Sequence, residues 1–170
     1  KSREVIVPLK GDNMGMATDK IGVSLALGYL VDSLLFPAAG YISDAHGRKK
    51  CGVTAFTIIS CGVLFLNSVD SFPMLCAASI VMGLGNGCSA GLVMTTGTDM
   101  APPPPQSGIF LGLYSNIFSI GGLAPALIGA VADCAGFGTA TLATGAIGVL
   151  GGLWYTCLVP ETLTKKGQAL

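Results

Sequence analysis

The sequence predicts an all-α protein that crosses a membrane several times, and three observations predict it. Of its 170 residues, 51% are hydrophobic and only 11% are charged, whereas a soluble domain carries about 25% charged residues. Five apolar runs are long enough to cross the hydrocarbon core, which takes about 20 residues of helix. The runs show no alternation of apolar and polar residues, so helices rather than strands are expected to satisfy the backbone in lipid.

The five runs follow one another with short connections. We expect membrane-spanning helices at residues 21–43, 51–69, 73–97, 108–132 and 138–159. The first run contains one charged residue, Asp32, and the second contains none. Residues 1–20 are expected to hold the end of a truncated helix and an outer loop, and residues 160–170 a cytoplasmic tail.

Basic residues near the ends of the runs predict the orientation. Residues 48–50 are all basic and the tail holds Lys165 and Lys166, whereas the loops after the second and fourth runs hold no basic residue. Both basic ends are therefore expected in the cytoplasm, although residues 1–20 carry four basic residues on the opposite side. We expect an integral, multi-pass protein of a plasma or inner membrane, with an organelle left open.

The composition gives no sign of a cofactor, a metal or a nucleic acid. The net charge is zero, which supplies no electrostatic attraction to nucleic acid. The six cysteines are far apart, no C-x-x-C pair is present and there is one histidine, so the close ligand pairs of a zinc site are missing. No catalytic triad or phosphate-loop pattern appears. We therefore expect no enzyme activity and no cofactor, with the lipid bilayer as the main surrounding.

Glycines recur at a spacing of four residues in several runs. These glycines are Gly83, Gly87 and Gly91 in the third run, and Gly108 and Gly112 in the fourth. The spacing predicts stripes along which helix backbones approach closely, although membrane helices are also rich in glycine in general. Pro125 lies inside the fourth run, where it removes a backbone hydrogen bond and is expected to kink the helix.

Charged residues gather in one short stretch after the first run. Its pattern is Gly40-x-x-x-Asp44-x-x-Gly47-Arg48-Lys49. We expect Gly40 to let a neighbouring helix come close, and Asp44 to face a helix N-terminus, whose partial positive charge favours a carboxylate. Gly47 permits a tight turn. Arg48 is expected to pair with Asp44, and Lys49 to hold the loop in the cytoplasm.

This pattern resembles the signature loop of the major facilitator superfamily, which lies between the second and third helices of each six-helix half. Further likeness comes from Gly83-Leu-Gly-Asn-Gly, from Asp99-Met-Ala-Pro, and from Pro160-Glu161-Thr162 just past the last run. The resemblance implies five full transmembrane helices of a six-helix C-terminal half, with the first helix of that half truncated. It also implies a missing N-terminal six-helix half as partner, and a charge cluster that locks the cytoplasmic side closed.

Two departures from the family pattern concern these charges. Ala45 stands where the family often has arginine, and residues 102–107 read Pro-Pro-Pro-Pro-Gln-Ser where another arginine is common. Their loss weakens the cytoplasmic charge network. It implies either a looser gate or a copy that no longer transports.

Asp32 is the only ionisable residue well inside a run, and such residues mark functional sites by default. One hypothesis is that it takes up a proton or pairs with a cationic substrate, and the other is that it only bonds a neighbouring helix. Arg3 is its candidate partner. Asn86, Asn116 and Ser119 are candidates for the transport path, and interhelical hydrogen bonds explain them equally well.

These expectations describe a secondary active transporter that moves a small solute across a membrane by alternating access. The resemblance is nearest to drug-efflux and metabolite-efflux carriers, which implies proton-coupled efflux, with a small molecule and H⁺ as ligands. The alternative is a non-transporting membrane scaffold, or a truncated transporter fragment, of the same fold.

Overall fold

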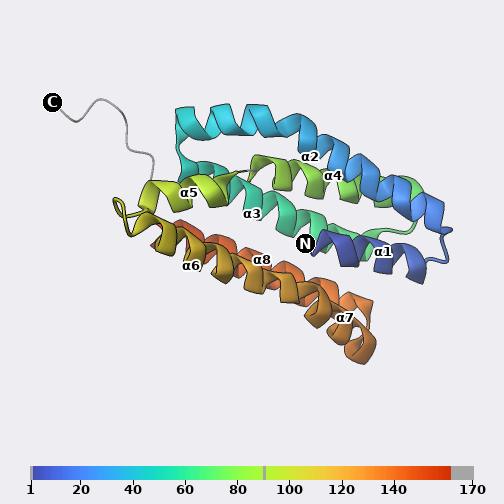
Figure 1. Ribbon diagram of the computed structural model, residues 1–170. Helices are drawn as coiled ribbons and strands as arrows, with labels where there is room; N and C mark the ends of the chain where they lie inside the picture. Colours follow the sequence, from blue (N-terminus) through green and yellow to red (C-terminus); the bar gives the residue numbers. More distant parts are fainter. Residues whose placement is uncertain (1, 90, 162–170) are drawn as a thin grey trace.

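The computed structural model describes residues 2–89 and 91–161. These residues are mostly helical and include no strand. The elements are α1 (Arg3–Asn13), α2 (Thr18–His46), α3 (Arg48–Phe65), η1 (Leu66–Ser68), α4 (Phe72–Cys88), α5 (Leu92–Met100), α6 (Ser107–Ile120), η2 (Gly121–Leu123), α7 (Ala124–Ala135) and α8 (Phe137–Leu158). Figure 1 shows an elongated bundle whose helices run along one long direction.

Five segments of the described chain are long and apolar enough to cross a membrane. They are Thr18–His46, Arg48–Ser68, Phe72–Met100, Ser107–Ala135 and Phe137–Leu158. Their helical conformation confirms the predicted fold class, an all-α multi-pass membrane protein. Two of the segments are interrupted, because the third is divided between α4 and α5 and the fourth between α6 and α7.

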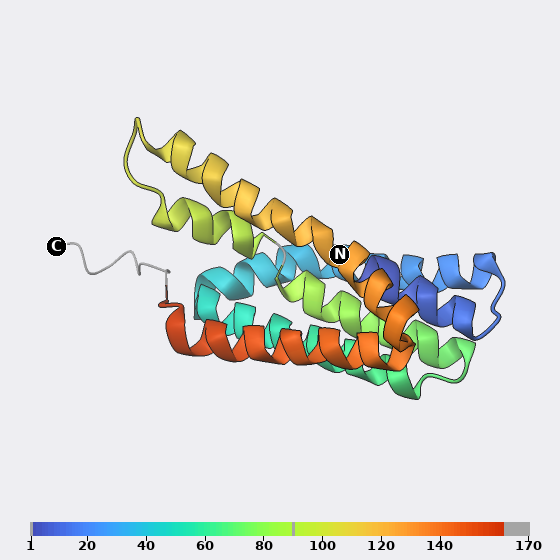
Figure 2. The ribbon, with the colours of Figure 1, turned by 90° about the horizontal axis from the view of Figure 1, so that it is seen from below.

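α4 packs against both α2 and α3, and the apolar core lies where α4 meets α3 and α1. Its buried side chains include Leu75 and Met82 of α4, Val63 of α3, and Ile6 and Val7 of α1. α8 packs along α3, while Figure 2 shows α6 and α7 running at an angle to α8. No residue of α6 is buried, so this helix presents its apolar side chains to lipid or to protein outside the described residues.

The close packing of α2 against α4 depends on glycine. A Cβ on Gly28 would lie 2.7 Å from the carbonyl oxygen of Ser79, and a Cβ on Gly83 would collide with the backbone of Gly28. A Cβ on Gly87 would lie 2.8 Å from the Cβ of Leu35. These distances are shorter than van der Waals contact, so a larger residue at any of these glycines would push the two helices apart.

The expected glycine stripe does not continue to Gly91, so that expectation is wrong. Gly91 has φ +74°, in the left-handed region that glycine adopts readily, and it lies between α4 and α5. Apart from its own helix, no described atom lies within 4 Å of a Cβ placed on Gly91, Gly108 or Gly112. The close approach expected at Gly108 and Gly112 is therefore also absent from the described part of the chain.

The fourth apolar segment is interrupted at Pro125. α6 ends at Ile120, a short 3₁₀ turn follows over Gly121–Leu123, and Pro125 lies in the first turn of α7. Proline is tolerated in a first turn because the N–H group that it lacks would have no partner within the helix. The helical path is therefore interrupted by one 3₁₀ turn beside Pro125, at the point where the kink is expected.

Candidate functional site

Asp32 lies in the middle of α2 and forms a buried polar cluster with Arg3 and Asn86. Asp32 is only 4% exposed. Its Oδ2 lies 3.2 Å from Nη2 of Arg3 on α1, and it accepts a hydrogen bond of 2.6 Å from Nδ2 of Asn86 on α4. The guanidinium of Arg3 also lies over the ring of Tyr29, 4.3 Å from its centroid. We call Asp32, Arg3 and Asn86 the Asp32 cluster. This cluster joins α1, α2 and α4.

The Asp32 cluster is not saturated with hydrogen bonds. Arg3 Nη1 and Asp32 Oδ1 are buried and have no hydrogen-bond partner among the described residues. A buried polar atom without a partner costs roughly 1–3 kcal/mol, and a charged one costs more. Nη1 of Arg3 is therefore open to another acceptor, and Oδ1 of Asp32 is open to a proton or to another donor.

The residues expected along a transport path separate into two places. Asn86 contacts Asp32, whereas Asn116 and Ser119 are exposed on α6. The hydroxyl of Ser119 donates to the carbonyl oxygen of Ser115 within its own helix. The structure therefore brings Arg3 and Asn86 to Asp32, and it does not bring Asn116 or Ser119 there.

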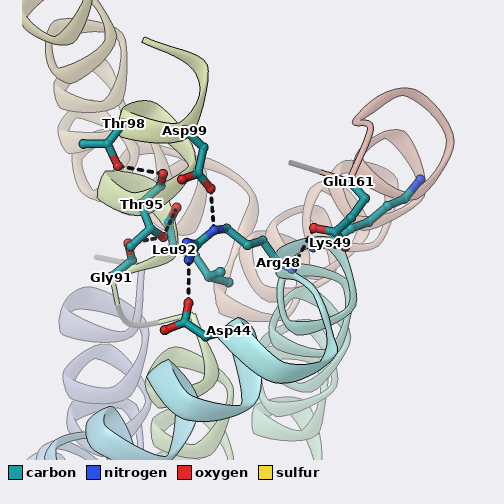
Figure 3. Close-up of polar contacts among 9 residues, drawn as sticks. All are labelled: Asp44, Arg48, Lys49, Gly91, Leu92, Thr95, Thr98, Asp99 and Glu161. Carbon is teal, nitrogen blue, oxygen red and sulfur yellow. Dashed lines mark hydrogen bonds and ion pairs between the residues drawn. The ribbon is translucent and has the colours of Figure 1, made fainter. Parts of the chain in front are cut away.

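A second polar cluster lies at the end of the bundle where α2 meets α3 (Figure 3). Gly47, with φ +107°, makes the turn between the two helices. Arg48 Nη1 lies 3.2 Å from Asp44 Oδ1, and Arg48 Nε donates to Asp99 Oδ2 near the end of α5. Together with Glu161, these residues form what we call the Arg48 cluster: Asp44, Arg48, Asp99 and Glu161.

Glu161, which follows α8, binds the first turn of α3. Its carboxylate accepts hydrogen bonds from the backbone N–H groups of Arg48, at 2.9 Å, and Lys49, at 3.2 Å. Such N–H groups have no partner within the helix, and the helix dipole favours a negative charge beside them. A Cβ on Gly47 would collide with this carboxylate. Glycine is therefore needed at position 47 for space as well as for backbone conformation.

One expectation for the charged loop is wrong, and another finds no counterpart among the described residues. Glu161, rather than Asp44, faces a helix N-terminus, while Asp44 pairs with Arg48. The physical reason is that α8 packs along α3, which places the residue after α8 beside the start of α3. Gly40 has no described atom beyond its own helix within 4 Å of a Cβ, so no described helix comes close to it.

Sequence reasoning missed two contacts of the Arg48 cluster. A signal for Asp99 exists, because the first and third apolar runs must end on the same side of a membrane. The fifth run ends on that side too, which brings Glu161 to the same end of the bundle, but nothing in the sequence singles it out as the cap of α3. Pro160 and Glu161 of the tail motif are described, and Thr162 lies outside the described residues, as do residues 163–170 of the expected tail.

Comparison with known proteins reveals similar transporters. The chain is 28% identical over 141 residues to the oxalate:formate antiporter of Oxalobacter formigenes, covering 82% of this chain and 33% of the relative. It is 29% identical over 160 residues to the inner membrane transport protein YnfM of Escherichia coli (strain K12), covering 92% and 38%. It is 23% identical over 112 residues to NarT, a probable nitrate transporter of Staphylococcus aureus, covering 64% and 28%.

The chain spans about a third of the length of these curated relatives. The family model of the Major Facilitator Superfamily matches residues 5–169, which is nearly all of the chain. The five apolar helices agree with this match, since they make the chain an integral, multi-pass membrane protein. By this match, the chain belongs to the Major Facilitator Superfamily.

Proposed function

We propose that this chain is part of a secondary active transporter that moves a small solute by alternating access, in proton-coupled efflux. The observation that carries the proposal is the Arg48 cluster. It ties the start of α3 to the end of α2, to the end of α5 and to the segment after α8. Alternating access needs contacts of this kind, which hold one end of a bundle closed in one state and break in the other.

The Arg48 cluster is suited to opening because its acids are accessible to water. The side chain of Asp44 is 66% exposed and that of Asp99 is 26% exposed. An exposed ion pair such as Asp44–Arg48 contributes about 0–1 kcal/mol, and the less exposed contact between Arg48 and Asp99 contributes more. Together these contacts favour the closed state, and each can be exchanged for hydration when the helices separate.

Asp32 is the group that we propose takes up the coupling proton. Arg3 from α1 and Asn86 from α4 face its carboxylate, and the guanidinium of Arg3 also lies over the ring of Tyr29 of α2. Protonation would remove the attraction that offsets the burial of the Arg3 charge, and a buried charge without its partner is unfavourable. Proton uptake would therefore favour a movement of α1 relative to α2 and α4.

We propose that the rest of the protein supplies an N-terminal six-helix half, with the solute bound between the two halves near the middle of the membrane. The names of the similar proteins suggest the first solutes to test, which are oxalate, formate and nitrate. The other hypothesis is a non-transporting scaffold, in which the Asp32 cluster only joins helices. A measurement of solute transport distinguishes the transporter from the scaffold.

The test uses the complete protein that contains this chain, reconstituted into liposomes. Exchange of labelled oxalate, formate, nitrate and a panel of drug-like cations is measured with and without an imposed pH gradient. The variants are Asp32→Asn and a matched control, Glu4→Gln. Glu4 also carries a carboxylate close to the cluster, where it accepts a hydrogen bond from Tyr29, but it is exposed.

We expect the wild type and Glu4→Gln to exchange at least one solute faster under the gradient. Asp32→Asn should retain exchange and lose the response to the gradient, because its side chain cannot release a proton. A folded wild-type protein that moves none of these solutes would support the scaffold. A wild type that exchanges solute without any response to the gradient would contradict proton coupling but would still support transport.

A further inference from the structure

A pocket of about 200 Å³ lies beside the turn that joins α2 to α3. Ala39, Ile42 and His46 of α2 line one wall, and Lys50 and Thr54 of α3 line the other. Cys88, the last residue of α4, also lines it. The pocket is formed by other side chains than those that make the Arg48 cluster, although both lie at the same end of the bundle.

The pocket lining is mostly apolar and includes two basic side chains. His46 and Lys50 lie next to the turn and are exposed. Neither forms an ion pair with a described residue, and none of the described residues that line the pocket is acidic. The nearby acids are engaged elsewhere, since Asp44 pairs with Arg48 and Glu161 binds the N–H groups of α3.

The apolar wall follows the membrane-spanning part of α2. Ile42 lies one turn before His46 and Ala39 almost two turns before it, toward the middle of the segment Thr18–His46. Helix ends of a spanning segment lie at the level of the lipid headgroups, and the preceding turns lie at the level of the acyl chains. His46 and Lys50 therefore lie at the level of a lipid headgroup, and Ala39 and Ile42 lie at the level of an acyl chain.

We propose that this pocket binds one anionic phospholipid, with its phosphate at Lys50 and His46 and the upper part of one acyl chain against Ala39, Ile42 and Thr54. Basic pockets between spanning helices are a recurring form of anionic lipid site. A small anion would leave the apolar wall uncovered, and in a zwitterionic lipid the headgroup cation would offset the charge of the phosphate beside Lys50. This proposal depends on the membrane location of the chain and not on transport activity.

The test measures lipid retained by the purified complete protein, using native mass spectrometry during titration. Phosphatidylglycerol is compared with phosphatidylcholine of the same acyl chains and with glycerol 3-phosphate, which has the phosphate without the chains. The variants are Lys50→Gln, which removes charge at the pocket, and Thr54→Phe, which fills the apolar wall. Lys49→Gln is the matched control, because it removes the same charge from the neighbouring position without lining the pocket.

We expect phosphatidylglycerol to bind at least fivefold more tightly than phosphatidylcholine, taking about 1 kcal/mol per basic group near anionic lipid. Lys50→Gln should lose about fivefold in affinity by the same rule, and Lys49→Gln should lose much less. Thr54→Phe should lower the affinity for phosphatidylglycerol while the charge of the pocket is unchanged. This variant therefore tests the proposal even if Lys50→Gln fails to fold.

Four results would overturn the proposal. Equal retention of the two lipids would show that charge does not select the occupant. Equal losses in Lys50→Gln and Lys49→Gln would show a general surface attraction rather than a site. Displacement of phosphatidylglycerol by an equal concentration of glycerol 3-phosphate, or unchanged binding in Thr54→Phe, would show that the acyl chain makes no contact.

Discussion

Glu161 is a single side chain whose carboxylate fixes the end of α8 to the start of α3. It accepts hydrogen bonds from the backbone N–H groups of Arg48 and Lys49. Those donors would otherwise face the membrane surface without a partner from the helix. The contact depends on Gly47, because a side chain there would occupy the position of the carboxylate.

Replacing Glu161 with alanine is expected to loosen the first turn of α3. A polar cap contributes about 0.5–2 kcal/mol, so the amides of Arg48 and Lys49 should exchange about 2- to 30-fold faster if they open locally. Hydrogen exchange measured by mass spectrometry checks this. Glu161→Gln keeps an acceptor oxygen and should fall between alanine and the wild type. Identical exchange in all three proteins would show that the contact does not stabilise the turn.

The packing of α2 against α4 is a property of these two elements, because each contributes glycine to the same contact. Gly28 of α2 faces the backbone of Ser79, and Gly83 of α4 faces the backbone of Gly28. The close approach of α2 and α4 also places Asn86 beside Asp32. The amide of Asn86 donates a hydrogen bond to the carboxylate of Asp32 there. The distance between the helices therefore determines the geometry of the Asp32 cluster.

Gly83→Ala is expected to destabilise the bundle, because the added methyl group meets backbone that cannot rotate away. Overpacking of this kind costs about 1–3 kcal/mol. The control is Gly108→Ala on α6, where a Cβ meets no described atom within 4 Å beyond its own helix and alanine favours a helix over glycine. Unfolding in mixed micelles with increasing denaturing detergent gives both free energies. A loss at Gly108 as large as at Gly83 would contradict this account.

Across the whole molecule, the Arg48 cluster is where segments distant in the sequence are joined at one end. Arg48 contacts Asp99, which lies 51 residues away, and Glu161 binds the start of α3 from 113 residues away. At the other end of the bundle, the apolar cluster around Leu75 and Met82 joins α1, α3 and α4. The two ends thus differ in kind, since one is held by charge and the other by apolar burial.

Asp99→Asn is expected to loosen α5 more than Asp44→Asn does. Each variant replaces one carboxylate that pairs with Arg48. The side chain of Asp99 is 26% exposed, whereas that of Asp44 is 66% exposed. Hydrogen bonds to charged groups contribute about 1.5–3 kcal/mol when shielded and less when exposed. Amide exchange in α5 of the complete protein measures the effect. Equal exchange in the two variants would mean that Arg48 does not hold α5 through Asp99.

Particular residues show how far the sequence alone could predict the site. Arg3 was the candidate partner of Asp32 and Asn86 was a candidate for the transport path, and both contact Asp32. Asn116 and Ser119 were candidates on equal grounds, yet they are exposed on α6. Residue type suggests which side chains are unusual in a membrane span, but the rotation of each helix about its axis decides which of them meet, and neighbouring helices determine that rotation.

The sequence by itself determined that the chain is helical, that it has five apolar segments long enough to cross a membrane, and where its charged turn lies. Lipid imposes these features locally, because each segment must satisfy its own backbone and exclude charge. Only the tertiary structure decided that Glu161 caps α3, that Asp99 binds Arg48, and that Gly83 packs tightly while Gly108 does not. Each of these depends on the position of a second helix, which no local pattern of residues specifies.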